Sequence, residues 1–292
     1  MLDFLYNFFI SPFYEFYFMK NALISLIILS FSSSIVGIFL TIKKLCLSGD
    51  AISHAILPGA AIGFLFFGLS VTAITICSFI GGIIVIIFSS LFSRISKSSE
   101  ENSLAVFYLI SIALGVLIIS ISGSNLDLLH FLFGSLFAIS NEIIITLSII
   151  SLISVFTIAI IIRPLIIDCM DPLFFKSVSN CGSLVHLIFM IIIVMNLVGG
   201  FQAIGTLMSV GILILPSISA RFWSNKLYKL IFISFIATII SSYFGLCLSF
   251  NLDLPSSPCI ILSLGVFYIF SFIFGLNNGI IWKFIKTHHL EN

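Results

Sequence analysis

The chain has 292 residues, of which 60% are hydrophobic and only 8% are charged, and its formal net charge is +1. So few charges cannot cover the surface of a soluble domain of this size, and no basic run is long enough to bind nucleic acid. The composition therefore predicts an all-α, polytopic transmembrane bundle in contact with membrane lipid, in which each span needs about 20 apolar residues.

The first residues differ in character from the rest of the chain. Aromatic side chains are mixed there with Asp3, Glu15 and Lys20, a composition typical of a segment that lies on the bilayer surface. We therefore expect residues 1–20 to form an N-terminal interfacial segment and residues 21–292 to form the transmembrane domain.

Nine apolar stretches follow this segment. The predicted spans cover residues 21–42, 54–69, 71–92, 103–121, 142–162, 184–199, 203–220, 229–249 and 258–276. Residues 126–138 are too short to cross and return, so a half-helix or re-entrant element is expected there. Residues 163–183 form the longest polar loop. If one short stretch fails to cross, the bundle has about eight spans instead of nine, and one end of the chain lies on the other side of the membrane.

The distribution of positive charge predicts the orientation of the chain in the membrane. Lys and Arg residues follow the first, third, fifth, seventh and ninth stretches, whereas the turns near residues 69, 122, 200 and 253 carry none. The positive-inside rule then places the N-terminus outside and the C-terminus in the cytoplasm.

Several kinds of catalytic site are missing from the sequence. It contains no G-x-x-x-x-G-K-[ST] phosphate loop, no H-E-x-x-H motif and no G-x-S-x-G motif. No two cysteines form a C-x-x-C pair, so a role as small apolar side chains is expected for Cys46, Cys77, Cys169, Cys181, Cys247 and Cys259. We expect a transporter without a bound cofactor and not an enzyme, because the few ionisable groups inside such a bundle usually mark a transport pathway.

Asp50 and His54 are the most informative of these ionisable groups. They are four residues apart, so on a helix they lie one turn from each other on the same face. A carboxylate and an imidazole so placed can bind a metal ion or carry protons. Two plainer alternatives stay open: Asp50 caps the start of a helix with Ser53 three residues on, and His54 is a hydrogen-bonded residue between helices.

The same segment predicts close packing of helices. Small side chains recur every four residues, and this ridge, which lets another helix approach closely, consists of Ala51, Ala55, Gly59 and Gly63. Pro58 removes a backbone hydrogen bond and is expected to bend the helix just beyond the Asp50/His54 pair.

Other polar side chains are weaker candidates. By the predicted topology Asp127 and His130 are external, where they could attract a cation, contact a partner or simply lie in a solvated loop. His186 is expected to cap or snorkel at the start of the sixth span, and His288 and His289 in the tail are expected to be solvated.

Four stretches of the sequence resemble one known family. Residues 48–59 (SGDAISHAILPG) closely resemble the signature of the permease subunits of ABC-type zinc, manganese and ferrous-iron importers. The likeness continues in residues 126–134 (LDLLHFLFG), in residues 205–221 with their apolar-Pro and Ala-Arg pairs, and in residues 252–258 (LDLPSSP). The stretches are ordered as in the family and span nearly the whole chain.

The resemblance implies a multi-pass permease of the bacterial plasma membrane that dimerises with an identical or related chain. It would take metal from an extracytoplasmic metal-binding protein and be driven by a separate cytoplasmic ABC ATPase. By motif position, Asp50 and His54 would bind Zn²⁺, Mn²⁺ or Fe²⁺ in the translocation path, and such ligands do not choose among these metals. The amphipathic loop 168–182 falls where the family has its coupling helix, which touches the ATPase. The family often has an acidic residue where this chain has Asn102, which weakens any role for the loop 94–103.

Two other functions remain open. An ion-coupled secondary metal transporter would be expected to contain inverted repeats with paired broken helices, yet the sequence has no second copy of the Asp50/His54 pattern. A non-transporting membrane scaffold would make this pair dispensable for the metal supply of the cell.

Overall fold

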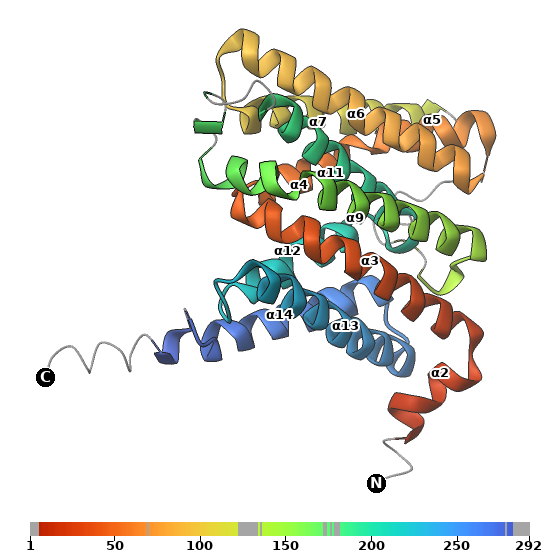
Figure 1. Cartoon of the computed structure of the whole chain (residues 1–292). Helices are drawn as coiled ribbons and strands as arrows, with labels where there is room; N and C mark the ends of the chain where they lie inside the picture. The colour runs from red at the N-terminus through yellow and green to blue at the C-terminus, as the bar shows by residue number, and fades with distance from the viewer. Residues whose placement is uncertain are drawn as a thin grey trace, which may run out of the picture.

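The computed structural model describes residues 6–68, 70–121, 134, 136–171, 174–175, 177, 182–277 and 279–282, and these residues form helices and no strand (Figure 1). In chain order the elements are η1 (Tyr6–Ile10), α2 (Ser11–Glu15), α3 (Tyr17–Ile42), α4 (Cys46–Ala55), α5 (Leu57–Phe67), α6 (Val71–Ser96), α7 (Glu100–Ile121), η2 (Leu136–Ala138), α9 (Asn141–Met170), α11 (Gly182–Ile204), α12 (Thr206–Ala220), α13 (Leu227–Leu252) and α14 (Ser256–Phe274).

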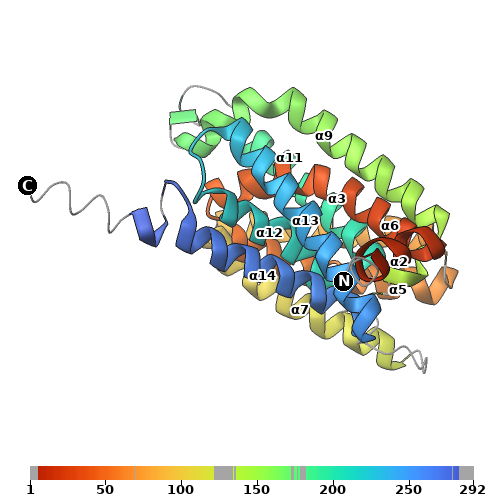
Figure 2. The ribbon, with the colours of Figure 1, turned by 90° about the horizontal axis from the view of Figure 1, so that it is seen from below.

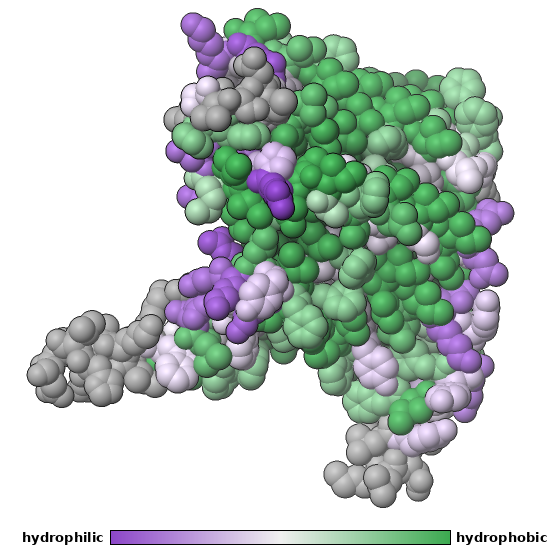
Figure 3. All heavy atoms as spheres, viewed as in Figure 1, coloured by the Kyte–Doolittle hydropathy of each residue, from purple (hydrophilic) through white to green (hydrophobic). Residues whose placement is uncertain are grey.

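Eight helical segments are long and apolar enough to cross a membrane, with α4 and α5 counted together as one of them. The remaining predicted span, residues 203–220, corresponds to α12, whose 15 residues reach only about 22 Å, less than the hydrocarbon thickness of about 30 Å. The prediction of an all-α bundle with eight or nine spans is therefore confirmed. Figure 3 shows the matching surface, with an apolar band between two hydrophilic margins.

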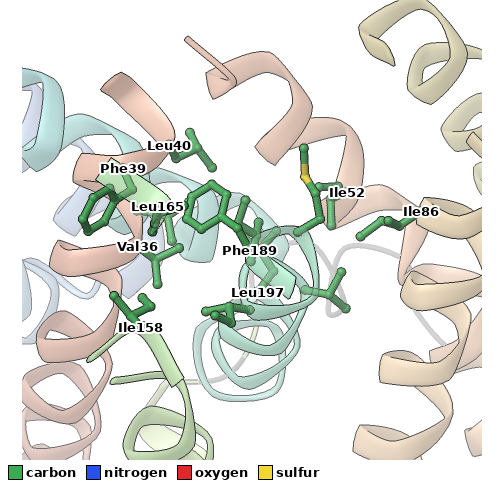
Figure 4. Packing of buried hydrophobic residues seen from close by; sticks show 14 of the residues in the cluster. Val36, Phe39, Leu40, Ile52, Ile86, Ile158, Leu165, Phe189 and Leu197 are labelled. Carbon is green, nitrogen blue, oxygen red and sulfur yellow. The ribbon is translucent and has the colours of Figure 1, made fainter. Parts of the chain in front are cut away.

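The centre of the bundle is formed by α3 and α11, each of which is 67% buried over its most apolar stretch, compared with 17% for α6 and α7. Figures 1 and 2 show both central helices enclosed by their neighbours. Phe39 of α3, Ile52 of α4 and Phe189 of α11 meet in the largest apolar cluster, where Leu165 of α9 joins them (Figure 4). This cluster places the start of α4 directly against the two central helices.

Two helix boundaries differ most from the predictions. Span two begins at Cys46 and not at residue 54, because α3 ends in a tight turn, with Lys44 at a φ of 61°, that starts α4 at once. Span five was predicted to end at residue 162, but α9 continues through Pro164 to Met170. The extension keeps Leu165 in the apolar cluster and buries Asp168, which the sequence had suggested lies in a polar loop.

A sharp corner at Gly205 separates α11 from α12. Gly205 has a φ of 83°, which a residue with a side chain rarely adopts, and Gly134 lies so close that an added Cβ would be 2.5 Å from the Gly205 nitrogen. The hydroxyl of Ser257 donates a hydrogen bond to the Ile204 carbonyl at 3.0 Å. Most of the predicted element at 126–138 lies outside the described residues, and its last residues form the single turn η2.

The N-terminal segment packs on α13. The Tyr243 hydroxyl donates a hydrogen bond to the Phe9 carbonyl at 2.6 Å, and the rings of Tyr243 and Phe13 stack with centroids 4.9 Å apart. Because α3 already begins at Tyr17, the helix starts before residue 20, where the predicted segment was expected to end. The placement of residues 1–20 on the bilayer surface stays a prediction.

Substitution Tyr243→Phe is expected to weaken this attachment by about 1 kcal/mol, the net contribution of one hydrogen bond. Limited proteolysis of the purified protein checks it, since cleavage within the N-terminal segment should become faster. Tyr228→Phe is the matched control, because Tyr228 is exposed on the same helix. Equal cleavage rates for the two variants would contradict the prediction.

Candidate metal site

Asp50 and His54 both lie on α4, with Asp50 Oδ1 and His54 Nε2 4.0 Å apart. The side chain of Asp50 is 60% exposed and that of His54 is 27% exposed, so the pair opens onto the surface of the single chain. Since α4 begins at Cys46, Asp50 lies in the helix interior, and the alternative that it caps the helix start is wrong. The predicted one-turn stacking of a carboxylate on an imidazole is present.

The imidazole of His54 packs against protein on the side of Nδ1 and is open to the surface on the other side. Its Nδ1 is buried and has no hydrogen-bond partner among the described residues, while its ring lies 6.4 Å from the ring of Tyr108 on α7. The Nε2 atom faces Asp50, which leaves one nitrogen and the carboxylate oxygens as donors on the open face. Nitrogen and oxygen donors of this kind suit Zn²⁺, Mn²⁺ and Fe²⁺.

Two donor side chains on one chain are too few to enclose a metal ion, because even zinc takes at least four ligands. Within the described parts of the chain, no group of three or more His, Cys, Asp or Glu side chains is placed to hold an ion. To hold a metal ion, the pair would therefore need further ligands from water or another chain.

The ridge of small residues holds α4 and α5 against their neighbours, as predicted. A Cβ at Gly59 would lie 2.3 Å from the Cys77 carbonyl oxygen of α6, and one at Gly63 would lie 3.0 Å from the Ile74 Cα. The hydroxyl of Ser111 on α7 donates to the Ala55 carbonyl at 3.1 Å. The helix is interrupted between Ala55 and Leu57, with Pro58 in the first turn of α5, at the place where a bend was predicted.

Substitution Gly59→Ala is expected to lower the stability of the protein by about 1–3 kcal/mol, because the new methyl group overlaps the backbone of α6. Gly265→Ala is the matched control: a Cβ there meets nothing within 4 Å, so the higher helix propensity of Ala should raise stability by up to about 1 kcal/mol. Thermal unfolding of the two purified variants should shift in opposite directions, and a shift of the same sign would refute the packing account.

A second group of charged side chains lies near the junction of α3 and α4, and the sequence did not predict it. Lys43 at the end of α3 forms an ion pair with Asp168 of α9, and its Nζ lies 3.3 Å from Nδ1 of His186 on α11. His186 Nε2 in turn lies 2.9 Å from a carboxylate oxygen of Glu100 on α7. His186 was expected to cap or snorkel at a helix start, and instead it bridges two other helices.

These four side chains line a cavity of about 990 Å³ together with Ile42, Lys44, Leu45, Ser93, Arg94, Lys97, Ser98, Cys169 and Ser183. The Arg94 guanidinium donates a hydrogen bond to the hydroxyl of Ser183 across this cavity. Figure 1 shows the ends of α3 and α9 and the start of α11 on the same side as the C-terminus, where the predicted topology places the cytoplasm.

Asp127, His130, His288 and His289 lie outside the described residues, so the structure does not test them. Cys46, one turn before Asp50, is half-buried and not part of any metal-holding group among the described residues. Asp50 and His54 are therefore the remaining candidates for metal ligands, and they still depend on the predicted role of their motif.

Comparisons with known proteins give one consistent result. Residues 15–275 match the ABC 3 transport family. A manganese import system permease protein, ScaB, from Streptococcus parasanguinis is 29% identical over 90% of this chain and 93% of its own length. A Haemophilus influenzae protein named "Probable iron transport system membrane protein" is 27% identical over 87% of this chain and 93% of its own. The solved structure of PsaBC from Streptococcus pneumoniae in complex with Fab matches with a TM-score of 0.84 and 27% identity, and the match covers 100% of both chains.

Proposed function

The chain belongs to the ABC 3 transport family, and from this premise we propose that it imports a divalent metal ion: manganese, ferrous iron or zinc. It is a multi-pass protein of the bacterial plasma membrane, with eight helices long enough to span it. Because the chain carries no phosphate loop, the ATP hydrolysis that drives transport takes place on a separate ATPase chain. Similar proteins named for manganese and for iron support the proposal and do not choose between the metals.

The observation that carries the proposal is the open pair of Asp50 and His54 on a membrane-spanning helix. A carboxylate left exposed in a span is costly unless it lines an aqueous path or is covered by protein. We propose that the metal ion passes along this face of α4. A second permease chain, identical or related, would cover it and supply the same two donors from the other side.

A binding protein outside the membrane would deliver the ion, and residues 168–182 would contact the ATPase on the cytoplasmic side. Two carboxylates and two imidazoles from a pair of chains give four donor groups, which is enough to hold a divalent ion briefly. Binding must remain weak enough for release, and oxygen and nitrogen donors without thiolates are compatible with that requirement.

Reconstitution tests the proposal. Vesicles that contain the chain, its ATPase and the metal-binding protein are expected to accumulate radiolabelled Mn²⁺ only when ATP is supplied on the ATPase side. Vesicles with the chain alone are expected to accumulate none, even with a proton or sodium gradient. Gradient-driven uptake by the chain alone would instead establish an ion-coupled carrier, and absence of uptake in every arrangement would support the scaffold alternative.

A further inference from the structure

The four charged side chains of the second cluster form a hydrogen-bond chain with a fixed direction. The Lys43 ammonium can only donate, so it donates to Asp168 and to Nδ1 of His186. Because Nδ1 accepts, the ring proton of His186 is on Nε2, from which it is donated to Glu100. This series of hydrogen bonds is complete only when His186 is neutral.

This hydrogen-bond chain joins four helices at points that matter for transport. Asp168 lies at the start of residues 168–182, the segment proposed to contact the ATPase, and His186 follows the end of that segment by four residues. Lys43 stands at the end of α3, and two residues separate it from the start of α4, the helix that carries Asp50 and His54. The side chains of Lys43 and Asp168 are 7% and 5% exposed, so movement of either displaces the other.

The turn after Lys43 is short and tightly held. Lys44 adopts a φ of 61°, and the Leu45 amide donates to the Leu40 carbonyl at 3.0 Å. A Leu40 methyl lies 3.2 Å from where a Cβ on Gly49 would stand, so the first turns of α4 pack on the last turn of α3. A shift of Lys43 is therefore a shift of the helix that presents Asp50.

We propose that Lys43, Asp168, His186 and Glu100 act as a coupling network, which transmits movement of the ATPase-contacting loop to the metal-bearing helix α4. This inference rests on the proposed function. Protonation of His186 puts a hydrogen on Nδ1, which faces the Lys43 ammonium at 3.3 Å. The like charges repel, the network opens and ATP hydrolysis no longer moves the metal.

The surroundings of His186 reinforce this effect. The ionisable side chains that face it across the cavity are Lys43 and Lys44 from the end of α3, Arg94 and Lys97 from the end of α6, Glu100 of α7, and Asp168 and Cys169 of α9. Helices α4 and α12 also pack on α11, and their described residues add no ionisable side chain to this cavity. Four cations thus face two carboxylates, and a charged imidazole adds a fifth cation.

The test measures metal ions transported per ATP hydrolysed by the full transporter in vesicles, as the pH on the ATPase side falls from about 7.5 to about 5.5, the range in which imidazoles take up protons. For the unmodified protein we expect this ratio to fall about tenfold, within the usual range of coupling between sites. His186→Gln keeps one donor and one acceptor but does not titrate, so its ratio should stay constant over the same pH range.

His186→Lys, which mimics the protonated ring, should hydrolyse ATP with a low transport ratio at every pH, whereas Lys229→Met, at an exposed cation of α13, should behave like the unmodified protein. If His186→Gln showed the same pH dependence as the unmodified protein, the network would not be the coupling element. That result stands even if His186→Lys does not fold. Absence of ATP-driven uptake by the unmodified protein would contradict the proposed function itself, which keeps the two failures distinct.

Discussion

Alanine in place of Asp50 or of His54 is expected to lower ATP-dependent metal uptake by about 100-fold or more. Among the described residues, each chain presents these two donors on the open face of α4, so either substitution removes half of that contribution to the proposed site. Loss of a group that merely orients a ligand already costs 10–100-fold in metal affinity or activity, and the loss of a ligand itself costs at least as much. Initial rates of radiolabelled Mn²⁺ uptake in cells that depend on this transporter measure the effect.

Cys46→Ser is the matched control for both variants. Cys46 precedes Asp50 by one turn on the same helix but belongs to no metal-holding group among the described residues, so uptake should stay within about twofold of the unmodified rate. Normal uptake by Asp50→Ala and His54→Ala, at equal membrane abundance, would refute the assignment. An equally large loss in Cys46→Ser would show that the helix, and not the two ligands, was disturbed.

The bundle could be predicted from the sequence because each long helix is an uninterrupted apolar run with charges near one end. Helix α6 ends close to Arg94 and Lys97, and α7 begins at Glu100, near the predicted boundaries. The same criterion failed at α4, where Gly49, Asp50 and Ser53 interrupt the apolar run. The helix continues through them nonetheless, since the Ser53 hydroxyl donates to the backbone carbonyl of Asp50 at 2.7 Å and the Asp50 side chain points to the open surface.

The candidate metal pair was accessible from the sequence because it depends on one short helix and a spacing of four residues. The coupling network was not, because its members come from four helices and Lys43 is 125 residues from Asp168. Such a contact depends on how α3, α7, α9 and α11 meet, which the hydrophobic pattern of any one of them does not specify. The sequence contained only a weaker indication of the network: its charged residues all lie at helix ends that the positive-inside rule places on the same side of the membrane.

Substitution Asp168→Ala is expected to destabilise the protein by about 3–5 kcal/mol, because it leaves the Lys43 ammonium buried without its carboxylate partner. The double variant Lys43→Met, Asp168→Leu should recover most of this loss, since a buried ion pair replaced by apolar side chains of similar size is often neutral in stability. Thermal unfolding of the purified single and double variants gives the interaction free energy as a double-mutant cycle.

Arg94→Met provides the control, because Arg94 lines the same cavity but is exposed and donates to the neutral hydroxyl of Ser183. Its unfolding should change by no more than about 0.5 kcal/mol. If the double variant were as unstable as Asp168→Ala, the loss would come from disturbed packing at the end of α9 and not from an unpaired charge.

The same double variant should also transport poorly despite its recovered stability, because Met at residue 43 offers no proton to His186. This result would separate the role of the pair in coupling from its contribution to folding.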